Sequence, residues 1–285
     1  MKFKPFLAIL VSMMLAGCGE ETSVAPTPTE EPSKEVSVAP TTTEEPITIP
    51  GLNLEMMPIP AGTFLMGSPN DEEGRDNDEG LHTVTITKPF WLGKTEVTQA
   101  LWKAVMGNNP SRFMGDDLPV EKVSWTDAVA FCEKLNEMKR DTLPAGYHYT
   151  LPMEAQWEYA CRAGTITQFS YGNDTGYSQL GSYVWCGDNS SSGTHPVGEK
   201  LPNDWGLYDM HGNVWEWCLD WYGEYPGGSI TDPQDPQSGT YRVLRGGGWG
   251  SHARFCRSAL RNGYGPGDTS RDLGFRVALT TVPSE

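Results

Sequence analysis

One cysteine in this chain lies where its thiol could be reactive. Residues 245–262 read RGGGWGSHARFCRSALRN and contain Cys256, with Arg254 and Arg257 close on either side. Neighbouring positive charge lowers the pKa of a thiol and raises the fraction of thiolate, the form that attacks electrophiles and binds soft metals. Cys256 could therefore be a nucleophile, a metal ligand or one half of a structural disulfide.

A second candidate site is the stretch DMHGNVWE, residues 209–216. Asp209 and Glu216 are carboxylates seven positions apart in a turn that contains glycine. Hard cations such as calcium bind several oxygens, from carboxylates and from exposed carbonyls. The alternative is that Glu216, which lies between Trp215 and Trp217, pairs with an arginine in the core.

Other common sites find no support in the sequence. The chain contains 5 histidines without paired metal-binding spacing, and it lacks a Cys-x-x-Cys motif. Ser251 and His252 are adjacent, and adjacent side chains of an extended segment point apart, which disfavours a Ser–His nucleophile. The acidic stretch DEEGRDNDEG, residues 71–80, lacks the closing ligand of an EF-hand, so we interpret it as a solvated loop.

Periodicity indicates the elements that would position these residues. Residues 56–68 contain a turn and a strand, and residues 81–93 alternate like a half-buried strand. Residues 95–107 predict a helix, a second helix begins at Ser124, and a third covers residues 152–164. The chain that follows is rich in loops, which need function, metal or disulfides to hold them.

The N-terminus has the pattern of a bacterial export signal. Lys2 and Lys4 form a short positive region, and the apolar run that follows them is too short to span a bilayer. The run ends in LAGC, the pattern of a lipoprotein signal in which Cys18 becomes the lipid-bearing N-terminus. We therefore expect residues 1–18 to be signal peptide and lipobox, and the protein to be lipid-anchored in the bacterial cell envelope. Because Gly19 follows the cysteine, we expect the outer membrane, facing the periplasm or the exterior.

Residues 19–50 are typical of a tether. SVAPTPTEEPSKEV (23–36) is followed by its near-copy SVAPTTTEEPITIP (37–50), and both are rich in Pro, Thr and Glu. This composition cannot bury a core, so we expect a disordered tether, and we assign residues 51–285 to one domain. The formal net charge of -16 repels nucleic acid, and we expect no nucleic-acid partner.

Seven ordered segments carry a family resemblance. They are IPAGTFLMGS, KTEVTQALW, PVEKVSWTDAVAFCEKLN, LPMEAQWEYACRAG, GLYDMHGNVWEW, YRVLRGGGW and LGFRVAL. Together, over about residues 55–279, they resemble the formylglycine-generating enzyme family, also called the sulfatase-modifying factor domain. The resemblance implies an α+β fold, a single mixed domain with little regular secondary structure that is distantly like C-type lectins. It also implies oxidation of a cysteine in secreted sulfatases to formylglycine, with oxygen and a copper ion held by two thiolates.

The two thiolates are not both present here. When the family's copper segment is aligned from Gly246, its two cysteines fall on Ser251 and Cys256, while Gly248 and Phe255 replace a serine and a tyrosine. Cu(I) prefers two thiolates, for which a serine hydroxyl is a poor substitute. We therefore expect no bound copper and no copper-dependent oxidase activity, and Cys256 is left as the only catalytic candidate.

Five cysteines remain if the N-terminal one is lipidated, and the envelope is oxidising, so we expect disulfides and one thiol left over. In the family a bridge joins the positions near Cys161 and Cys256, which implies this pair here. Cys186 with Cys218 is a second possible pair. Cys132 lies on the apolar face of the predicted second helix and would be the buried free thiol.

The resemblance also implies a calcium site. The family binds calcium with the equivalents of Asp209, the Gly212 carbonyl, the Val214 carbonyl and Glu216. Asp209 replaces an asparagine of the founding enzymes, and its added negative charge should not weaken such a site. We therefore expect calcium as a structural ion.

Three functions are compatible with the resemblance. If the scaffold keeps the family's substrate groove without the copper pair, the protein is an envelope module that binds a protein or peptide. By position, the groove candidates are Trp215, Trp249, Arg254 and Phe255. An alternative is an active oxidase that modifies a cysteine or serine of a secreted substrate protein, with Cys256 as its thiol. A third is a carbohydrate-binding lipoprotein. We favour the first because the segments of the scaffold are intact while the thiolate pair is missing.

Overall fold

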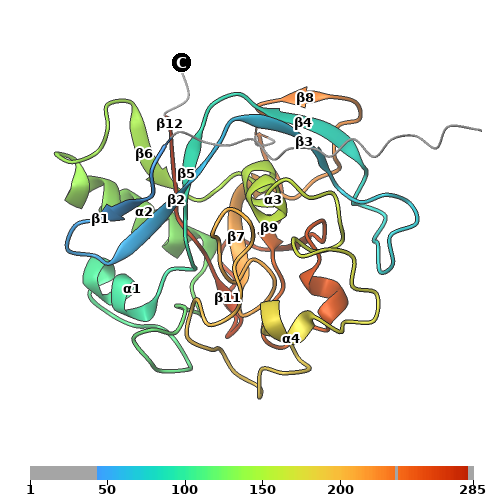
Figure 1. The fold of residues 1–285 in the computed structure, drawn as a ribbon. Helices are drawn as coiled ribbons and strands as arrows, with labels where there is room; N and C mark the ends of the chain where they lie inside the picture. The colour runs from blue at the N-terminus through green and yellow to red at the C-terminus, as the bar shows by residue number, and fades with distance from the viewer. Residues whose placement is uncertain (1–43, 235–236, 282–285) are drawn as a thin grey trace, which may run out of the picture. The chain divides into compact units, whose positions relative to one another are not determined.

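The structure is a computed structural model in which residues 44–234 and 237–281 are described. It confirms the α+β class, since helices and short strands are interspersed along the chain and joined by long loops (Figure 1). Cys18, the signal segment 1–18 and most of the tether 19–50 lie outside the described residues, so their roles stay predictions. Within the described ranges, no helix is long and apolar enough to cross a membrane.

A five-stranded sheet brings together the two ends of the described chain. Its order is β1-β2-β5-β12-β6, and neighbouring strands are antiparallel. The last strand, β12, pairs with both β5 and β6, so the end of the domain closes onto its beginning. The strands are β1 (Ile47–Ile49), β2 (Leu54–Ile59), β5 (Phe90–Gly93), β12 (Ala278–Thr281) and β6 (Tyr147–Thr150).

The position of β1 corrects the predicted start of the domain. Residues 47–49 were assigned to the tether, but they pair with residues 54–56 as the edge strand of the sheet. The side chain of Ile49 is buried, and Ile47 packs against the main core cluster. The alternating Ile-Thr-Ile of this segment has the period of a half-buried strand, so the folded region extends to the N-terminal side of residue 51.

Two smaller sheets contain the remaining strands, and β7 in the first of them carries Trp215, Glu216 and Cys218. The four-stranded sheet has the order β10-β9-β7-β11, and the three-stranded sheet has the order β3-β4-β8. Residues 81–93, predicted as one strand, form β4 and β5 in different sheets, with Pro89, which cannot donate a ladder hydrogen bond, between them. The strands are β10 (Asn262–Tyr264), β9 (Arg242–Arg245), β7 (Trp215–Trp221), β11 (Leu273–Gly274), β3 (Gly62–Met66), β4 (His82–Ile86) and β8 (Ile230–Thr231).

The helices begin and end within a few residues of their predicted limits. The Thr98 side chain accepts from the backbone at the start of α1, and Gly107 at φ 83° ends that helix. Ser124 and Asp127 form a reciprocal capping box at the start of α2. The helices are α1 (Gln99–Met106), α2 (Trp125–Lys139), α3 (Glu154–Arg162), α4 (Leu180–Tyr183) and a 3-10 turn, η1 (Ala253–Cys256).

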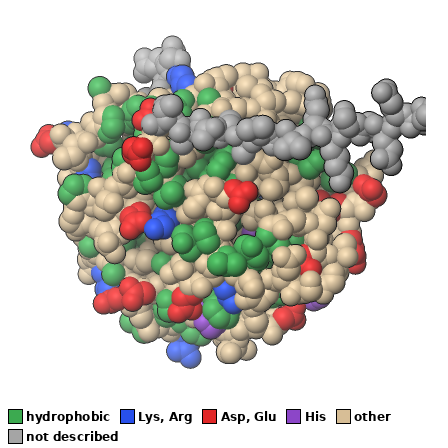
Figure 2. Space-filling model, in the orientation of Figure 1, with side chains coloured by type: hydrophobic (Ala, Val, Ile, Leu, Met, Phe, Trp, Pro, Cys, Tyr) green, Lys and Arg blue, Asp and Glu red, His purple; other side chains and the backbone are tan. Residues whose placement is uncertain are grey.

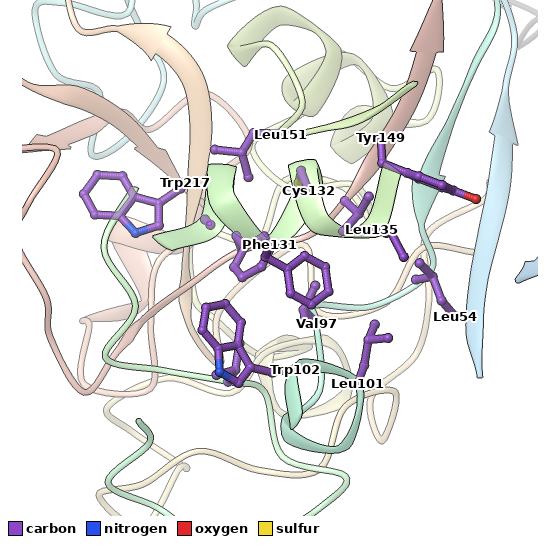
Figure 3. Close-up of a cluster of buried hydrophobic side chains, with 14 of the residues drawn as sticks. Leu54, Val97, Leu101, Trp102, Phe131, Cys132, Leu135, Tyr149, Leu151 and Trp217 are labelled. Carbon is purple, nitrogen blue, oxygen red and sulfur yellow. The ribbon is translucent and has the colours of Figure 1, made fainter. Parts of the chain in front are cut away.

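Aromatic rings pack among aliphatic side chains in the main hydrophobic core (Figure 3). The Trp102 ring stacks on Phe131 with centroids 5.5 Å apart, so α1 and α2 are joined through their buried faces. Phe275 stands edge-on to Phe131 at 5.3 Å, which ties the segment before β12 to the same core. Cys132 is buried among these side chains, as the helical spacing predicted.

Ion pairs between arginine and glutamate are also buried. Because an unpaired charge inside a protein costs several kcal/mol, each of these arginines needs its partner. The acidic side chains of the surface, by contrast, are scattered over the face that Figure 2 shows. The buried pairs are Arg162–Glu158, Arg245–Glu158, Arg257–Glu79, Arg261–Glu154 and Arg276–Glu216.

Candidate functional site

Cys256 ends the 3-10 turn η1 and is completely buried. Burial raises the pKa of its thiol well above the usual value, and the nearby Cys186 acts in the same direction. Gly247 packs directly against it, at φ 80°, where a Cβ would stand 2.6 Å from the Cys256 sulfur. Cys256 is therefore a buried thiol in the fold described here, and its burial favours the protonated form over a reactive thiolate.

The two flanking arginines do not activate the thiol because each contacts another group. Arg257 is buried and pairs with Glu79 at 2.5 Å and with Glu72 at 2.6 Å. Arg254 is exposed, and its guanidinium lies over the Phe255 ring at 4.4 Å.

The same contacts correct the interpretation of the acidic loop, residues 71–80. Glu72 and Glu79 of this loop hold Arg257, and Glu79 has no exposed surface. The loop is therefore docked on the Cys256 segment rather than solvated throughout.

Ser251, at the position of the missing thiolate, forms a turn. Its hydroxyl accepts from the Gly248 N–H at 3.1 Å, and its carbonyl accepts from the Gly187 N–H at 2.8 Å. The neighbouring His252 caps η1, with Nδ1 accepting from the Arg254 N–H at 3.2 Å. The side chains of Ser251 and His252 each accept a hydrogen bond from a different backbone N–H. This supports the sequence argument against a Ser–His nucleophile.

None of the five cysteines of the described chain is bridged, and all are buried. The proposed bridges Cys161–Cys256 and Cys186–Cys218 are not formed in the structure. Cys186 and Cys256 share one hydrophobic cluster, whereas Cys161 and Cys218 lie in another. Each predicted bridge would thus join two separate clusters. The resemblance implied only the first of these pairs, and it carries no information on how the cysteines pack in this chain.

The four proposed groove residues are not brought together as an open groove. Trp215 and Trp249 are buried, and the Trp249 indole donates to the Arg271 carbonyl at 2.9 Å. Phe255 is half-buried against the main core, and Arg254 covers its ring. These side chains pack the protein itself, and none of them lines the three clefts described below.

Glu216, one of the predicted calcium ligands, pairs with an arginine in the structure. Both of its oxygens accept from Arg276 at 2.6 Å, and Oε2 also accepts from the Trp157 indole at 2.7 Å. All of these groups are buried. The alternative stated for Glu216, an arginine partner in the core, is therefore the one that the structure shows.

Asp209 keeps an oxygen without a partner. Its Oδ2 accepts from the Gly198 N–H at 2.7 Å, but its buried Oδ1 has no hydrogen bond in the described part of the chain. Burial raises the pKa of Asp209 to about 6. Gly212, in the same turn, has φ 115°, and a Cβ there would lie 2.2 Å from the Trp185 carbonyl, so only glycine fits.

Glu96 is a candidate residue that the sequence analysis missed. It is 2% exposed, and neither carboxylate oxygen has a hydrogen-bond partner among the described residues. Burial and the nearby charge of Asp209 raise its pKa well above the usual value. Nothing in the local sequence separates Glu96 from an ordinary helix-flanking glutamate, because Asp209 lies far away along the chain. The carboxyl of Glu96 also lies within hydrogen-bonding reach of Asp209. Two facing buried carboxyls form a site that either a shared proton or a bound cation would satisfy.

Comparison with known proteins identifies the family. A family model described as "Sulfatase-modifying factor enzyme 1-like domain" matches residues 44–281. The chain belongs to this family. Its matched region also begins at residue 44, in agreement with the position of β1.

Two relatives and one solved structure are similar to this chain over most of its length. "Chaperone protein LppX" of Paenibacillus barcinonensis is 32% identical over 236 residues, covering 68% of this chain and 81% of that protein. "Formylglycine-generating enzyme" of Mus musculus is 34% identical over 218 residues, covering 72% of this chain. The structure of Treponema denticola variable protein 1 matches with a TM-score of 0.74 and 36% identity, covering 84% of this chain and 99% of that one. The chain spans 55% of the mouse enzyme's length, about half.

The described surface of this family member has several clefts, of which three are prominent. The largest, about 810 Å³, lies beside the β1–β2 turn and the first turn of α1. A second, of about 400 Å³, and a third, of about 280 Å³, adjoin each other at the start of α3, where both are lined by Ala155, Pro233 and Gln234. No cysteine is among the residues that line these three clefts.

Proposed function

We propose that the protein is a cell-envelope binding module that retains the family scaffold, binds a protein or peptide, and lacks copper-dependent formylglycine oxidase activity. The observation that carries the proposal is the state of Cys256, a buried thiol with a raised pKa and no second thiol in its loop. The relative named "Chaperone protein LppX", which is 32% identical, supports a binding role, because a chaperone binds other proteins.

The residues present do not fit a copper ion. Cu(I) in this family needs two thiolates, whereas Ser251 uses its hydroxyl in a turn and Cys256 is protonated and enclosed. A copper ion would also need a path from solvent to the Cys256 sulfur. Gly247 packs directly against that sulfur. An oxidase that uses Cys256 alone would have to open η1 and release Arg257 from Glu72 and Glu79.

We also propose a structural calcium ion held by Asp209 and Glu96 rather than by Asp209 and Glu216. The unpartnered oxygens of the first pair fit a hard cation, and the Gly212 and Val214 carbonyls implied by the family would add further oxygens. Glu216 is already neutralised by Arg276. The ion would replace the missing partners of the two buried carboxyls and so stabilise the turn at residues 209–216.

A direct test is to incubate the purified domain with copper, oxygen and a peptide that contains Cys-x-Pro-x-Arg, and then to measure the mass of the peptide. We expect the peptide thiol to persist, with an authentic formylglycine-generating enzyme as the positive control. Conversion of the thiol to an aldehyde by the domain would overturn the proposal.

Binding is tested separately by following the aggregation of a chemically unfolded secreted enzyme by light scattering. We expect the domain to slow the aggregation in proportion to its concentration. An equal mass of the heat-denatured domain serves as the control. If the folded domain and the control act alike, the binding role is wrong.

A further inference from the structure

The pocket of about 280 Å³ at the start of α3 is lined neither by the turn at residues 209–216 nor by the turn η1 that holds Cys256. Pockets that hold a whole small molecule measure about 300–1,000 Å³, so this one has room for a single side chain. The adjoining cleft of about 400 Å³ shares Ala155, Pro233 and Gln234 with it. The two together suit an extended peptide that inserts one side chain into the smaller pocket.

The charged groups of this pocket are engaged by the fold. Both oxygens of Glu154 accept from Arg261, at 2.6 and 2.8 Å, and the guanidinium of Arg245 lies 3.7 Å from the same carboxylate. Asp220 accepts from the Glu154 N–H at 2.6 Å. Glu224 stands at the exposed rim, where solvent screens its charge. The pocket therefore favours a neutral ligand over an ion of either sign.

The built-in donors of the pocket also point at acceptors of the fold. Arg261 donates from Nη1 to the Gly223 and Asp78 carbonyls, at 2.9 and 3.2 Å, and its guanidinium lies over the Tyr225 ring at 3.9 Å. The Tyr225 hydroxyl donates to Glu154 at 3.1 Å. All three guanidinium nitrogens and the phenol proton are thus used, and an anionic ligand would have to displace these contacts.

One acceptor in the wall has no donor. His82 Nδ1 lies 2.8 Å from the Gly80 carbonyl, which can only accept, so Nδ1 carries the proton of the neutral ring and Nε2 is an acceptor. Within the described residues Nε2 has no hydrogen bond, although His82 is only 8% exposed and lines the pocket. A nearly buried acceptor is costly unless a donor meets it. The pocket is therefore suited to a ligand with one neutral donor.

The rest of the wall is apolar or aromatic. The rings of His82 and Tyr225 lie 4.6 Å apart at a tilt of 51°, which leaves ring faces and edges that a further aromatic ring can pack against. A flat apolar body with a hydroxyl at its far end suits both this wall and the free acceptor, and it describes a tyrosine side chain. Serine and threonine carry a hydroxyl on too little apolar surface to fill the cavity. The apolar walls are formed by Met66, Ala155, Trp221, Pro226, Ile230 and Pro233.

We propose that this pocket is a specificity pocket for a tyrosine side chain of a bound peptide, with the tyrosine hydroxyl donating to Nε2 of His82. The adjoining cleft would hold the residues next to the tyrosine. This inference rests on the proposed binding function and names the site and the side chain that it selects. It places recognition at α3 and β8, away from the four groove residues that the sequence suggested.

The test compares three synthetic peptides by titration calorimetry on the purified domain. They are Ac-Ala-Ala-Tyr-Ala-Ala-NH2 and the same peptide with phenylalanine or lysine for tyrosine. We expect the tyrosine peptide to bind about tenfold more tightly than the phenylalanine peptide, which leaves the buried acceptor without a donor. The lysine peptide should bind no better than the phenylalanine peptide. Equal binding of the tyrosine and phenylalanine peptides, tightest binding of the lysine peptide, or binding of none would overturn the pocket.

A variant of the acceptor identifies the group that reads the hydroxyl. His82→Phe keeps a ring in the wall and removes Nε2, so the tyrosine and phenylalanine peptides should bind equally to it. Because the two peptides are compared on the same protein, a general loss of affinity does not affect the ratio. A tenfold preference for tyrosine that persists in His82→Phe would overturn the role of His82.

A second pair of variants locates the binding without altering His82. Ile230→Trp on β8 fills the pocket and should abolish the preference for tyrosine. Thr231→Trp is the matched control, because adjacent strand residues point to opposite faces and Thr231 is exposed. If Ile230→Trp and Thr231→Trp behave alike, the pocket is not the site.

The outcomes also separate this inference from the proposed function. Peptides that bind without preference for tyrosine leave the binding module in place and remove only the pocket. Oxidation of the Cys-x-Pro-x-Arg peptide would instead remove the proposed function, whatever the three pentapeptides do.

Discussion

The Cys256 segment and the Glu96–Asp209 pair both bury ionisable groups, but they differ in what surrounds them. Around Cys256 the charges are matched, since Arg257 is held by Glu72 and Glu79, and burial keeps the thiol protonated. Around Glu96 and Asp209, three carboxylate oxygens have no hydrogen-bond partner in the described chain. The Cys256 segment is packed into the fold, and the unsatisfied polar atoms lie elsewhere. Function is therefore better sought where polar groups still lack partners.

If the Cys256 segment is structural, removing its buried cation should be costly. We expect Arg257→Ala to lower the free energy of unfolding by about 3–5 kcal/mol, because Glu72 and Glu79 would lose their partner. Urea denaturation followed by circular dichroism measures the change. Arg254→Ala, three residues away and exposed, should cost less than about 0.5 kcal/mol. Equal effects of the two variants would contradict the structural role.

If the carboxylate pair is the working site, calcium should stabilise the domain through it. At a calcium concentration about 100 times Kd we expect about 2.7 kcal/mol of stabilisation, which appears as a lower melting temperature when a chelator is added. Glu96→Gln should remove the calcium-dependent shift. Glu55→Gln, an exposed glutamate of β2, is the control and should keep it. A shift that persists in Glu96→Gln would show that the ion is held elsewhere.

A substitution at Gly247 tests how tightly the Cys256 thiol is packed. We expect Gly247→Ala to cost about 1–3 kcal/mol of stability, because its positive φ disfavours a side chain and the new Cβ would meet the Cys256 sulfur. In the same loop, Gly250→Ala has no neighbouring atom within 4 Å of the added carbon. It should be close to neutral in the same denaturation experiment. A tolerated Gly247→Ala would mean that the thiol has room to move.

Restoring the second cysteine should have the smallest effect. We expect Ser251→Cys to cost about 1 kcal/mol or less through the lost hydrogen bond from Gly248, and to leave the copper-dependent peptide assay without product. The reason is that Cys256 stays enclosed by Gly247 and η1. Appearance of aldehyde in this variant would show that only the missing thiol, and not the burial of Cys256, prevents oxidation.

The sequence predicted the scaffold better than the sites because its signals were local. The capping box of Ser124 and Asp127, the ends of the helices and the buried position of Cys132 follow from spacing within one element, and the structure confirms them. The ordered segments of the family indicated the fold for the same reason. Boundaries were less well determined, as the early position of β1 shows.

Contacts between distant segments were not predictable from spacing. Glu96 meets Asp209, and Glu79 meets Arg257, across more than a hundred residues, so no local pattern indicates either contact. The acidic composition of residues 71–80 predicted an exposed loop. In the structure Glu72 and Glu79 pair with the buried Arg257, so part of the loop is buried. Among the positions transferred by resemblance, Trp249 is buried and Cys161 is a buried free thiol in the structure.

The measurement that tests the central claim most directly is the accessibility of the Cys256 thiol. The native domain is treated with an alkylating reagent, digested and analysed by mass spectrometry, and the experiment is repeated in denaturant without reductant. We expect Cys256 to remain unmodified in the native protein and to be fully modified once unfolded, as a buried free thiol requires. Rapid labelling of Cys256 in the native state, or its recovery in a disulfide with Cys161, would contradict the account.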